Sequence, residues 1–317
     1  EFGRLTMVEE YTGNGATLYA TTNYHFDERD LLFEIIDNDV QGSQTLIQYN
    51  GFGRKYSMND PDMGSWSYGY DALGNLTSQT DARGCTTTVT YDDLNRPTSK
   101  SYTGPGACDS TPDVTYTYDS TAGGNEGLGH RTGMTDGSGS KTWLYNELSQ
   151  IINEIDTIEN TSYSTSTALD AFGRPLIQVL PSGEGLTYSY NAMGALSGLS
   201  GTNTYVSQVH YAASGQITDQ LLGNNLRRQS CYDADTLRLS SLRVYSGTLQ
   251  SCGTTPSSPR LNLSYSYQPN GNVSEIVDST RSETLNYTYD ELDRLLSVDG
   301  PYNQGYSYDS IGNLRTK

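Results

Sequence analysis

Hydrophobic and polar residues alternate in short runs along most of the chain. In Leu261–Tyr267 every second residue is Leu or Tyr, and in Thr86–Tyr91 the alternate positions are Thr87, Val89 and Tyr91. A period of two residues in segments of this composition predicts β-strands. Ile151–Asp156 is compatible with a helix, but its neighbours Thr157 and Thr161–Thr167 favour strand. The alternation therefore predicts an all-β chain.

Turn residues follow the predicted strands in a fixed order. Tyr70 is followed by Asp71 and, three residues later, by Gly74. An Asp or Asn side chain can accept a hydrogen bond from a backbone amide ahead of it, and Gly adopts positive φ without a Cβ clash. Each unit is therefore predicted to be a β-hairpin, with the next strand starting after the turn.

This unit repeats along the chain. The steps from Tyr49 to Tyr70 and on to Tyr91 are each 21 residues, whereas longer steps carry insertions rich in Gly, Ser, Thr and Pro. With degenerate copies the count is about 13 repeats. Hairpins paired edge to edge are expected to place the tyrosine rings in a column with cross-strand contacts. The repeat-defining residues are Tyr49, Tyr70, Asp71, Gly74, Tyr91, Asp92, Tyr118, Tyr145, Tyr190, Tyr211, Tyr232, Tyr267, Tyr289, Asp290, Tyr308, Asp309 and Gly312.

The composition favours a thin wall over a filled core. Hydrophobic residues make up 34%, including 26 Tyr. Counting Gly in place of Tyr gives about 36%, below the roughly 45–50% of ordinary globular domains. The net charge of −18 is dispersed and argues against nucleic acid as a partner. No apolar run of the length needed for a membrane span is present in the sequence.

The four cysteines are spaced at close to one repeat length. Cys85 and Cys108 are 23 residues apart, and Cys231 and Cys252 are 21 apart. Of the three possible pairings, only these two place partners on adjacent hairpins. Two disulfides and an oxidising, extracellular setting are therefore predicted. Four reduced thiols in small packing sites are the alternative.

The sequence predicts no catalytic residue, no cofactor and no metal site. His25, His130 and His210 are scattered and fit no metal or triad pattern. Gly137–Lys141 lacks phosphate-loop spacing and is expected to be a hairpin tip. Calcium is a weaker alternative to turn formation for several acidic positions. These are Asp37, Asp39, Asp60, Asp62, Asp233 and Asp235.

The units Tyr70–Leu76, Tyr289–Leu295 and Tyr308–Leu314 resemble the YD or Rhs repeat. That repeat is found in bacterial Rhs and wall-associated proteins, in the cocoon subunits of insecticidal toxin complexes and in animal teneurins. The resemblance extends over nearly the whole chain. It implies a hairpin strip wound as a spiral into a hollow shell, half-shell or tube. The resemblance also implies that bacterial shells enclose a toxic domain and carry an autoproteolytic aspartate motif near an Asp-Pro-x-Gly-Leu stretch. Asp60–Gly64 lacks the Gly-Leu ending of that stretch.

These observations lead to a functional hypothesis. Residues 1–317 are predicted to form one array, cut mid-repeat at both ends. The array is expected to be a non-catalytic scaffold or shell of a secreted or cell-surface protein, enclosing or presenting another domain of the same parent protein. The alternative is an extracellular adhesion, carbohydrate-binding or fibre-forming element, with carbohydrate or a second copy of the chain as partner.

Overall fold

The computed structural model describes residues 3–11, 17–37, 43–309 and 312–317, and almost all of them lie in strands and the turns between them. The chain divides into two compact units, Glu1–Ser164 and Thr165–Lys317. The all-β prediction is confirmed. The predicted strands Thr86–Tyr91 and Leu261–Tyr267 are β8 and β22, and Ile151–Asp156 lies within strand β13. That residues 1–317 form one array stays a prediction.

The described elements of the first unit are β1 (Met7–Tyr11), β2 (Leu18–Phe26), β3 (Leu32–Asp37), β4 (Gln44–Tyr49), β5 (Lys55–Asp60), β6 (Gly64–Tyr70), β7 (Leu76–Thr80), β8 (Thr86–Tyr91), β9 (Pro97–Thr103), the 3-10 helix η1 (Gly106–Cys108), β10 (Val114–Tyr118), the 3-10 helix η2 (Ala122–Gly124), β11 (Arg131–Asp136), β12 (Gly139–Tyr145) and β13 (Ile151–Ile158). Strand β14 (Thr161–Leu169) begins in the first unit and ends in the second.

The described elements of the second unit are β15 (Pro175–Val179), β16 (Gly185–Tyr190), β17 (Leu196–Ser200), β18 (Thr204–Tyr211), β19 (Ile217–Leu222), β20 (Leu226–Tyr232), β21 (Leu239–Ser246), β22 (Leu261–Tyr267), β23 (Val273–Asp278), β24 (Glu283–Tyr289), β25 (Leu295–Asp299), β26 (Gln304–Gly305), β27 (Ser307–Tyr308) and β28 (Leu314–Thr316). No helix in the described part of the chain is long and apolar enough to cross a membrane.

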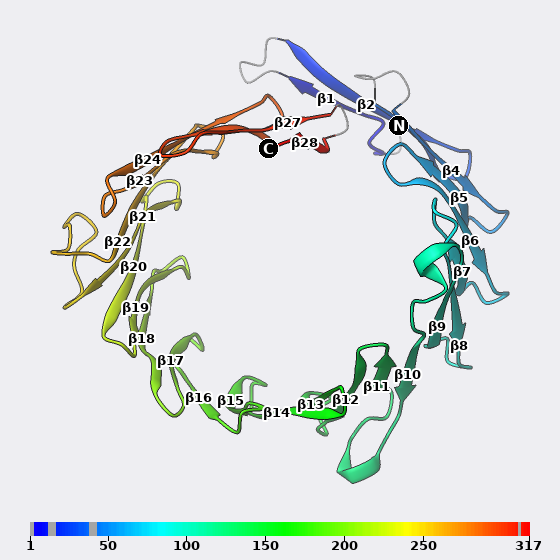
Figure 1. Ribbon diagram of the computed structural model, residues 1–317, viewed down its shortest axis with the longest axis horizontal. Helices are drawn as coiled ribbons and strands as arrows, with labels where there is room; N and C mark the ends of the chain where they lie inside the picture. The colour runs from blue at the N-terminus through cyan, green and yellow to red at the C-terminus, as the bar shows by residue number, and fades with distance from the viewer. Residues whose placement is uncertain (1–2, 12–16, 38–42, 310–311) are drawn as a thin grey trace. The chain divides into compact units, whose positions relative to one another are not determined.

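Within each unit, most successive strands are antiparallel neighbours in a sheet, and β27 and β28 pair as a separate two-stranded sheet. Strands β5 to β9, for example, pair β5–β6, β6–β7, β7–β8 and β8–β9 in chain order. In the second unit β20 to β25 follow the same rule. Figure 1 shows this strand-after-strand succession inside each unit. Neighbours in sequence are therefore neighbours in space, as tandem hairpins require.

A register shift marks each repeat tyrosine. Gly69 pairs with Ser78 but Tyr70 pairs with Leu76, so Thr77 is an extra residue on the returning strand. The same kind of shift occurs at all eleven repeat tyrosines. A bulge of this kind bends the strand and locally disrupts the ladder of backbone hydrogen bonds. Each hairpin whose first strand ends in a repeat tyrosine therefore bends next to its turn.

The core is sparse. Among the described residues, the buried apolar side chains are Met58, Trp143, Leu186, Val209, Cys231, Tyr245 and Val298. The chain exposes 19153 Å² to solvent, whereas two separate compact domains of half its mass would together expose about 16,000 Å². Most strands of each unit are therefore covered only in part, and their stability comes largely from ladders and side-chain hydrogen bonds.

The best-buried part of the second unit lies under the insertion between β21 and β22. Arg227 Nε and Gln229 Nε2 donate hydrogen bonds to the carbonyl oxygens of Gly247 and Gln250, at 3.5 and 2.6 Å. The backbone amide of Gln250 donates to Tyr245 Oη at 3.1 Å. Tyr245 is only 1% exposed. This insertion, residues 247–260, folds back over β20 and β21 and supplies a local second layer.

Candidate functional site

The repeated tyrosine is a hydrogen-bond donor that joins consecutive repeats. Tyr91 Oη donates to the carbonyl oxygen of Leu76 at 2.9 Å, and Leu76 is the first residue of β7 and the strand partner of Tyr70. All eleven repeat tyrosines make this bond, at 2.7 to 3.0 Å, to the first residue of a returning strand. Each hydroxyl therefore satisfies a carbonyl group at the bulge of the preceding hairpin.

The donor and acceptor pairs follow the chain in order. They are Tyr49 with Leu32, Tyr70 with Lys55, Tyr91 with Leu76, Tyr118 with Pro97, Tyr145 with Arg131, Tyr190 with Pro175, Tyr211 with Leu196, Tyr232 with Ile217, Tyr267 with Leu239, Tyr289 with Val273 and Tyr308 with Leu295. Burial raises the pKa of several of these phenols, among them Tyr49, Tyr118, Tyr145, Tyr190, Tyr267 and Tyr289.

The expected column of stacked tyrosine rings is wrong. In the described ranges the aromatic contacts are His25 with Phe33, Trp66 with Tyr68, and His130 with Tyr145, and none joins two repeat tyrosines. The reason is spacing, because consecutive repeat tyrosines such as Tyr70 and Tyr91 lie on β6 and β8, two strand spacings or about 10 Å apart. The tyrosine contributes a directed hydrogen bond and a ring face for a cation.

The Asp or Asn after the tyrosine closes the turn. Asp92 Oδ1 accepts hydrogen bonds from the backbone amides of Leu94 and Arg96, both at 2.9 Å. The backbone amide of Asn95 donates to the carbonyl of Asp92 at 3.0 Å, and Asn95 has φ of 60°. Bonding to the Arg96 amide holds the pKa of Asp92 below its usual range. The side chain thus supplies the acceptor that the tight turn needs.

The same turn recurs at the other repeat positions. Asp71 accepts from the amides of Gly74 and Asn75, and Gly74 has φ of 98°, where a Cβ atom is unfavourable. Asp290 accepts from the amides of Leu292 and Arg294. Asp309 accepts from the amide of Asn313, after Gly312 at φ of 93°. The turn chemistry expected from the sequence therefore has a direct structural counterpart.

The arginine after the turn joins its own repeat to the next one. Arg96 Nε donates to Asp92 at 2.7 Å, and its terminal nitrogens donate to the two carboxylate oxygens of Asp119 at 3.0 and 2.6 Å. Its guanidinium lies 4.3 Å from the centre of the Tyr118 ring. Bonding to Asp119 and then to Asp92 raises the pKa of Arg96. Asp119 is held below its usual pKa by Arg96.

Other arginines at this position make equivalent contacts. Arg174 pairs with Asp170, donates to the carbonyl of Gly194 at 3.2 Å, and lies 4.2 Å from the Tyr190 ring centre. Arg54 donates to the carbonyl of Asp71 at 3.0 Å. Sequence reasoning assigned this arginine only to the start of the returning strand. Its position directly after the turn residue with positive φ, which is Gly53, Asn95 or Gly173, was the signal that could have revealed the forward contact.

The structure joins the cysteines as predicted. Cys85 bonds Cys108 with Cα atoms 5.6 Å apart, and Cys231 bonds Cys252 with Cα atoms 5.7 Å apart. The first bond fastens the segment between β9 and β10 to the start of β8. The second fastens the insertion that covers Tyr245 to β20. Both therefore anchor long inter-strand segments to the sheet.

The acidic candidates serve turns in the structure. Asp60 accepts from the amides of Asp62 and Met63, and Asp233 accepts from those of Asp235 and Thr236. Asp39 lies outside the described residues, and Asp37 ends β3. Over the part of the chain that the structure describes, no three His, Cys, Asp or Glu side chains converge as a metal site would require.

Two histidines pair with carboxylates across neighbouring strands. His25 Nδ1 lies 2.6 Å from Glu34, and His210 Nδ1 lies 3.1 Å from Asp219. Asp219 is 1% exposed and also accepts from Arg227 Nη1. Sequence reasoning did not foresee this cluster around the buried Asp219, because its members are brought together only by cross-strand register. Of the segment Gly137–Lys141 that was expected to be a hairpin tip, Gly137 and Ser138 form the tip between β11 and β12, whereas Gly139–Lys141 lie in β12.

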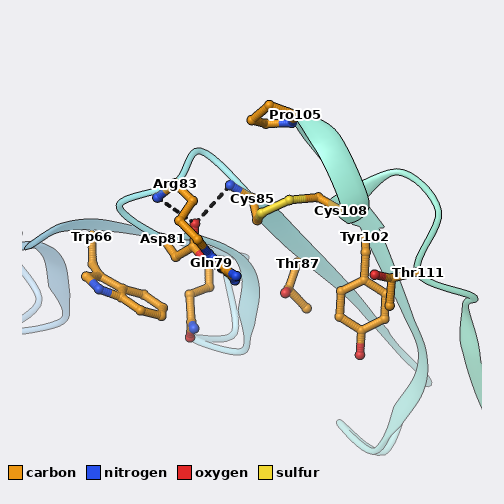
Figure 2. A pocket seen from close by; sticks show the side chains of 10 residues that line it. All are labelled: Trp66, Gln79, Asp81, Arg83, Cys85, Thr87, Tyr102, Pro105, Cys108 and Thr111. Carbon is orange, nitrogen blue, oxygen red and sulfur yellow. Dashed lines mark hydrogen bonds and ion pairs between the residues drawn. A yellow bond between two sulfur atoms is a disulfide. The ribbon is translucent and has the colours of Figure 1, made fainter. Parts of the chain in front are cut away.

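A pocket of about 500 Å³ lies in the first unit, on the sheet face of β6 to β9 (Figure 2). It is lined by Trp66, Gln79, Asp81, Arg83, Cys85, Thr87, Tyr102, Pro105, Cys108 and Thr111. The turn residues Asp81 and Arg83 form an ion pair of 2.7 Å at its rim. The disulfide and the segment after β9 bound its other side. Nothing in the sequence pattern alone pointed to this pocket.

Comparisons with known proteins agree with the fold. The RHS Repeat family model matches residues 70–106. No curated protein matches the chain at the sequence level. Among solved structures, the toxin complex TcdB2-TccC3 without its hypervariable C-terminal region superposes with a TM-score of 0.79 at 19% identity, and TcdB2-TccC3 itself with 0.78 at 18%. The Tc holotoxin pore of Photorhabdus luminescens gives 0.77 at 19%.

Each of these matches covers 97% of this chain and 18% of the other, so the chain spans less than a fifth of their length. At such identity the superposition establishes the fold. The matched residues 70–106 include Tyr70, Asp71, Gly74, Tyr91 and Asp92, which build two of the turns described above. The resemblance to the Rhs/YD-repeat family is confirmed: the chain carries an RHS repeat and has the β-strip fold found in toxin-complex shells.

Proposed function

We propose that the chain is a structural scaffold, a segment of wall one hairpin thick that encloses another domain of the same parent protein. One observation carries the proposal. The tyrosine, the turn residue and the arginine of the motif bond within the repeat or to the adjacent one, as Tyr118, Asp92 and Arg96 do. The most regular chemistry of the chain therefore holds repeats together, and the role is structural rather than catalytic.

The setting follows from the same features. Two disulfides fasten segments of the strip, and such bonds persist in oxidising compartments. A secreted or cell-surface location is therefore part of the proposal. The sparse core and large exposed area suit a wall, since a wall needs two accessible faces. One structural relative is described as lacking a hypervariable C-terminal region. This favours a variable domain of the parent protein as the partner.

Protease protection of the adjacent domain tests the enclosing role. The parent polypeptide is treated with protease under native conditions, with the isolated adjacent domain as control. We expect the adjacent domain to resist cleavage in the parent and to be cut readily alone. Reduction of both disulfides with mild denaturant should remove the protection. Equal cleavage of the domain in both settings would exclude enclosure.

Self-association into fibres stays a prediction. Light scattering over a series of protein concentrations tests it, because fibre formation raises the scattering as the concentration rises.

A further inference from the structure

The insertion between β21 and β22, residues 247–260, is held on the sheet through its backbone. Arg243 Nη1 and Nη2 donate hydrogen bonds to the carbonyl oxygens of Thr254 and Cys252, at 2.8 and 2.6 Å. Within the insertion only Pro256 is buried. The insertion therefore covers β20 and β21 without a packed core of its own. A segment with so few buried contacts opens at a low free energy once no covalent bond holds it.

Beneath the insertion, Arg243 has no carboxylate partner in the described part of the chain. The arginines of the repeat motif differ, since Arg96 and Arg174 each pair with an aspartate. The guanidinium of Arg243 donates only to carbonyl oxygens of the insertion, and its buried Nε has no hydrogen-bond partner among the described residues. A carboxylate accepts two parallel hydrogen bonds from a guanidinium and binds it more strongly than neutral carbonyl oxygens do. This face therefore matches an acidic ligand better than the segment that covers it.

The strands under the insertion are cationic, although the whole chain is acidic. Residues 226–246, which form β20, β21 and the turn between them, contain four arginines and two aspartates, a net charge of +2 against −18 for the chain. The insertion adds Arg260 and no acidic residue. The carboxylate of Asp219 on the neighbouring β19 is already paired with Arg227. The local charge therefore attracts an anionic segment, which the net charge of the chain opposes elsewhere.

One covalent bond fastens the insertion to the sheet. Cys231 in β20 is 3% exposed, whereas Cys252 is an exposed residue of the insertion. A dithiol therefore reaches the Cys252 sulfur: its thiolate forms a mixed disulfide with Cys252 and expels the Cys231 thiolate, which takes up a proton. The second thiol of the dithiol then closes a disulfide within the reductant and releases Cys252, which is protonated in turn. Two electrons and two protons pass from the dithiol to the protein disulfide.

We propose that residues 247–260 are a lid, closed by the Cys231–Cys252 disulfide, over a docking face for an acidic, extended polypeptide segment. The lid itself shows that the face accepts a polypeptide, since four side-chain hydrogen bonds from β20 and β21 end on backbone carbonyl oxygens of the lid. Reduction of the disulfide leaves those bonds as the main attachment. A segment whose carboxylates pair with Arg243 then displaces the lid. The proposal does not depend on the enclosing role.

Oxidised and reduced forms of one polypeptide test the lid. In the full chain with Cys85→Ser and Cys108→Ser, the lid disulfide is the only one left, so a dithiol changes nothing else. A fluorescent peptide of alternating Asp and Thr is titrated against both forms by anisotropy, with an Asn and Thr peptide and a single-stranded oligothymidine as comparison probes. We expect the acidic peptide to bind the reduced form about tenfold more tightly than the oxidised form. If this variant does not fold, Cys231→Ser with Cys252→Ser, compared with the unmodified oxidised chain, decides.

Charge-matched variants identify the docking face. With the lid disulfide open, Arg243→Gln should weaken binding of the acidic peptide about tenfold. Arg228→Gln should change it by less than about twofold, because Arg228 lies on the opposite face of β20 and contacts Gln220. Three results would each overturn the proposal: the acidic peptide binds both redox forms equally or neither, a comparison probe gains as much on reduction, or the two arginine variants bind alike.

Discussion

The hydroxyl of Tyr91 donates a 2.9 Å hydrogen bond to the carbonyl oxygen of Leu76, 15 residues earlier in the chain. Leu76 is the residue that pairs with Tyr70, so the bond reaches from one repeat to the bulge of the preceding one. A backbone ladder fixes how two strands pair. This added side-chain bond ties each bend to the next hairpin, and it requires the tyrosine hydroxyl, which phenylalanine lacks.

Removing that hydroxyl should destabilise the first unit. Tyr91→Phe leaves the ring in place but takes away the donor, and a net loss of about 0.5–1.5 kcal/mol in the free energy of unfolding is expected. The control is Tyr102→Phe, whose hydroxyl has no bond to the described residues, and its change should stay within about 0.5 kcal/mol. Urea denaturation under non-reducing conditions measures both. Equal stability of the two variants would contradict the assigned role.

The turn depends on a side-chain oxygen, whichever residue supplies it. Asn191 Oδ1 accepts from the amides of Met193 and Ala195, both at 3.0 Å. Asn191→Ala should cost about 1–2 kcal/mol, since it leaves those amides without their acceptor. Asn191→Asp should lie close to the unmodified chain, because Asp170 makes the same turn. Chemical denaturation gives both values, and an Ala variant as stable as the Asp variant would refute the role of the oxygen.

Each disulfide should stabilise its unit by about 3 kcal/mol, the loop-closure value for 21 to 23 residues. The double variant Cys231→Ser, Cys252→Ser should also loosen residues 247–260 and expose the buried Tyr245. Hydrogen exchange of this segment and the urea midpoint measure the two effects. The matched variant Cys85→Ser, Cys108→Ser should leave exchange in 247–260 unchanged. Protection of that segment in reduced and oxidised protein alike would contradict the anchoring role.

Stability should fall in acid. Hydrogen bonds lower the pKa of Asp71, Asp81, Asp92, Asp119, Asp136 and Asp170 in the folded chain. The folded state then binds fewer protons than the unfolded state, so their contribution is complete above about pH 4, the ordinary Asp pKa, and is lost as pH falls through the lower folded values. Urea midpoints between pH 7 and pH 2 should drop mainly below pH 4. Constant midpoints down to pH 2 would show that these bonds contribute nothing.

Local features of the fold could be predicted from the sequence. The alternation of hydrophobic and polar residues predicted strands such as β8 and β22, because a two-residue period arises wherever one face of the sheet is partly covered. The Asp and Gly positions predicted the turns, since the conformational preferences of these residues shape a turn of only four residues. The cysteine pairs followed from their spacing. These predictions required only the local chain and the repeat length.

Features that depend on register between strands could not be predicted. The bond from Tyr91 to Leu76 depends on the bulge in the preceding hairpin. The expected ring contacts are missing because consecutive repeat tyrosines lie two strands apart. The cluster of His210, Asp219 and Arg227 joins three strands, and only cross-strand register brings it together. The pocket between Trp66 and Tyr102 likewise arises from the pairing of β6 to β9.

Cryo-electron microscopy of the purified chain, with both disulfides intact, tests the central claim of a scaffold wall most directly. The scaffold account predicts particles whose density is a wall one hairpin thick, with consecutive repeats side by side and no filled core between sheets. A solid particle with a packed interior would contradict that account, and so would a continuous fibre as the only species.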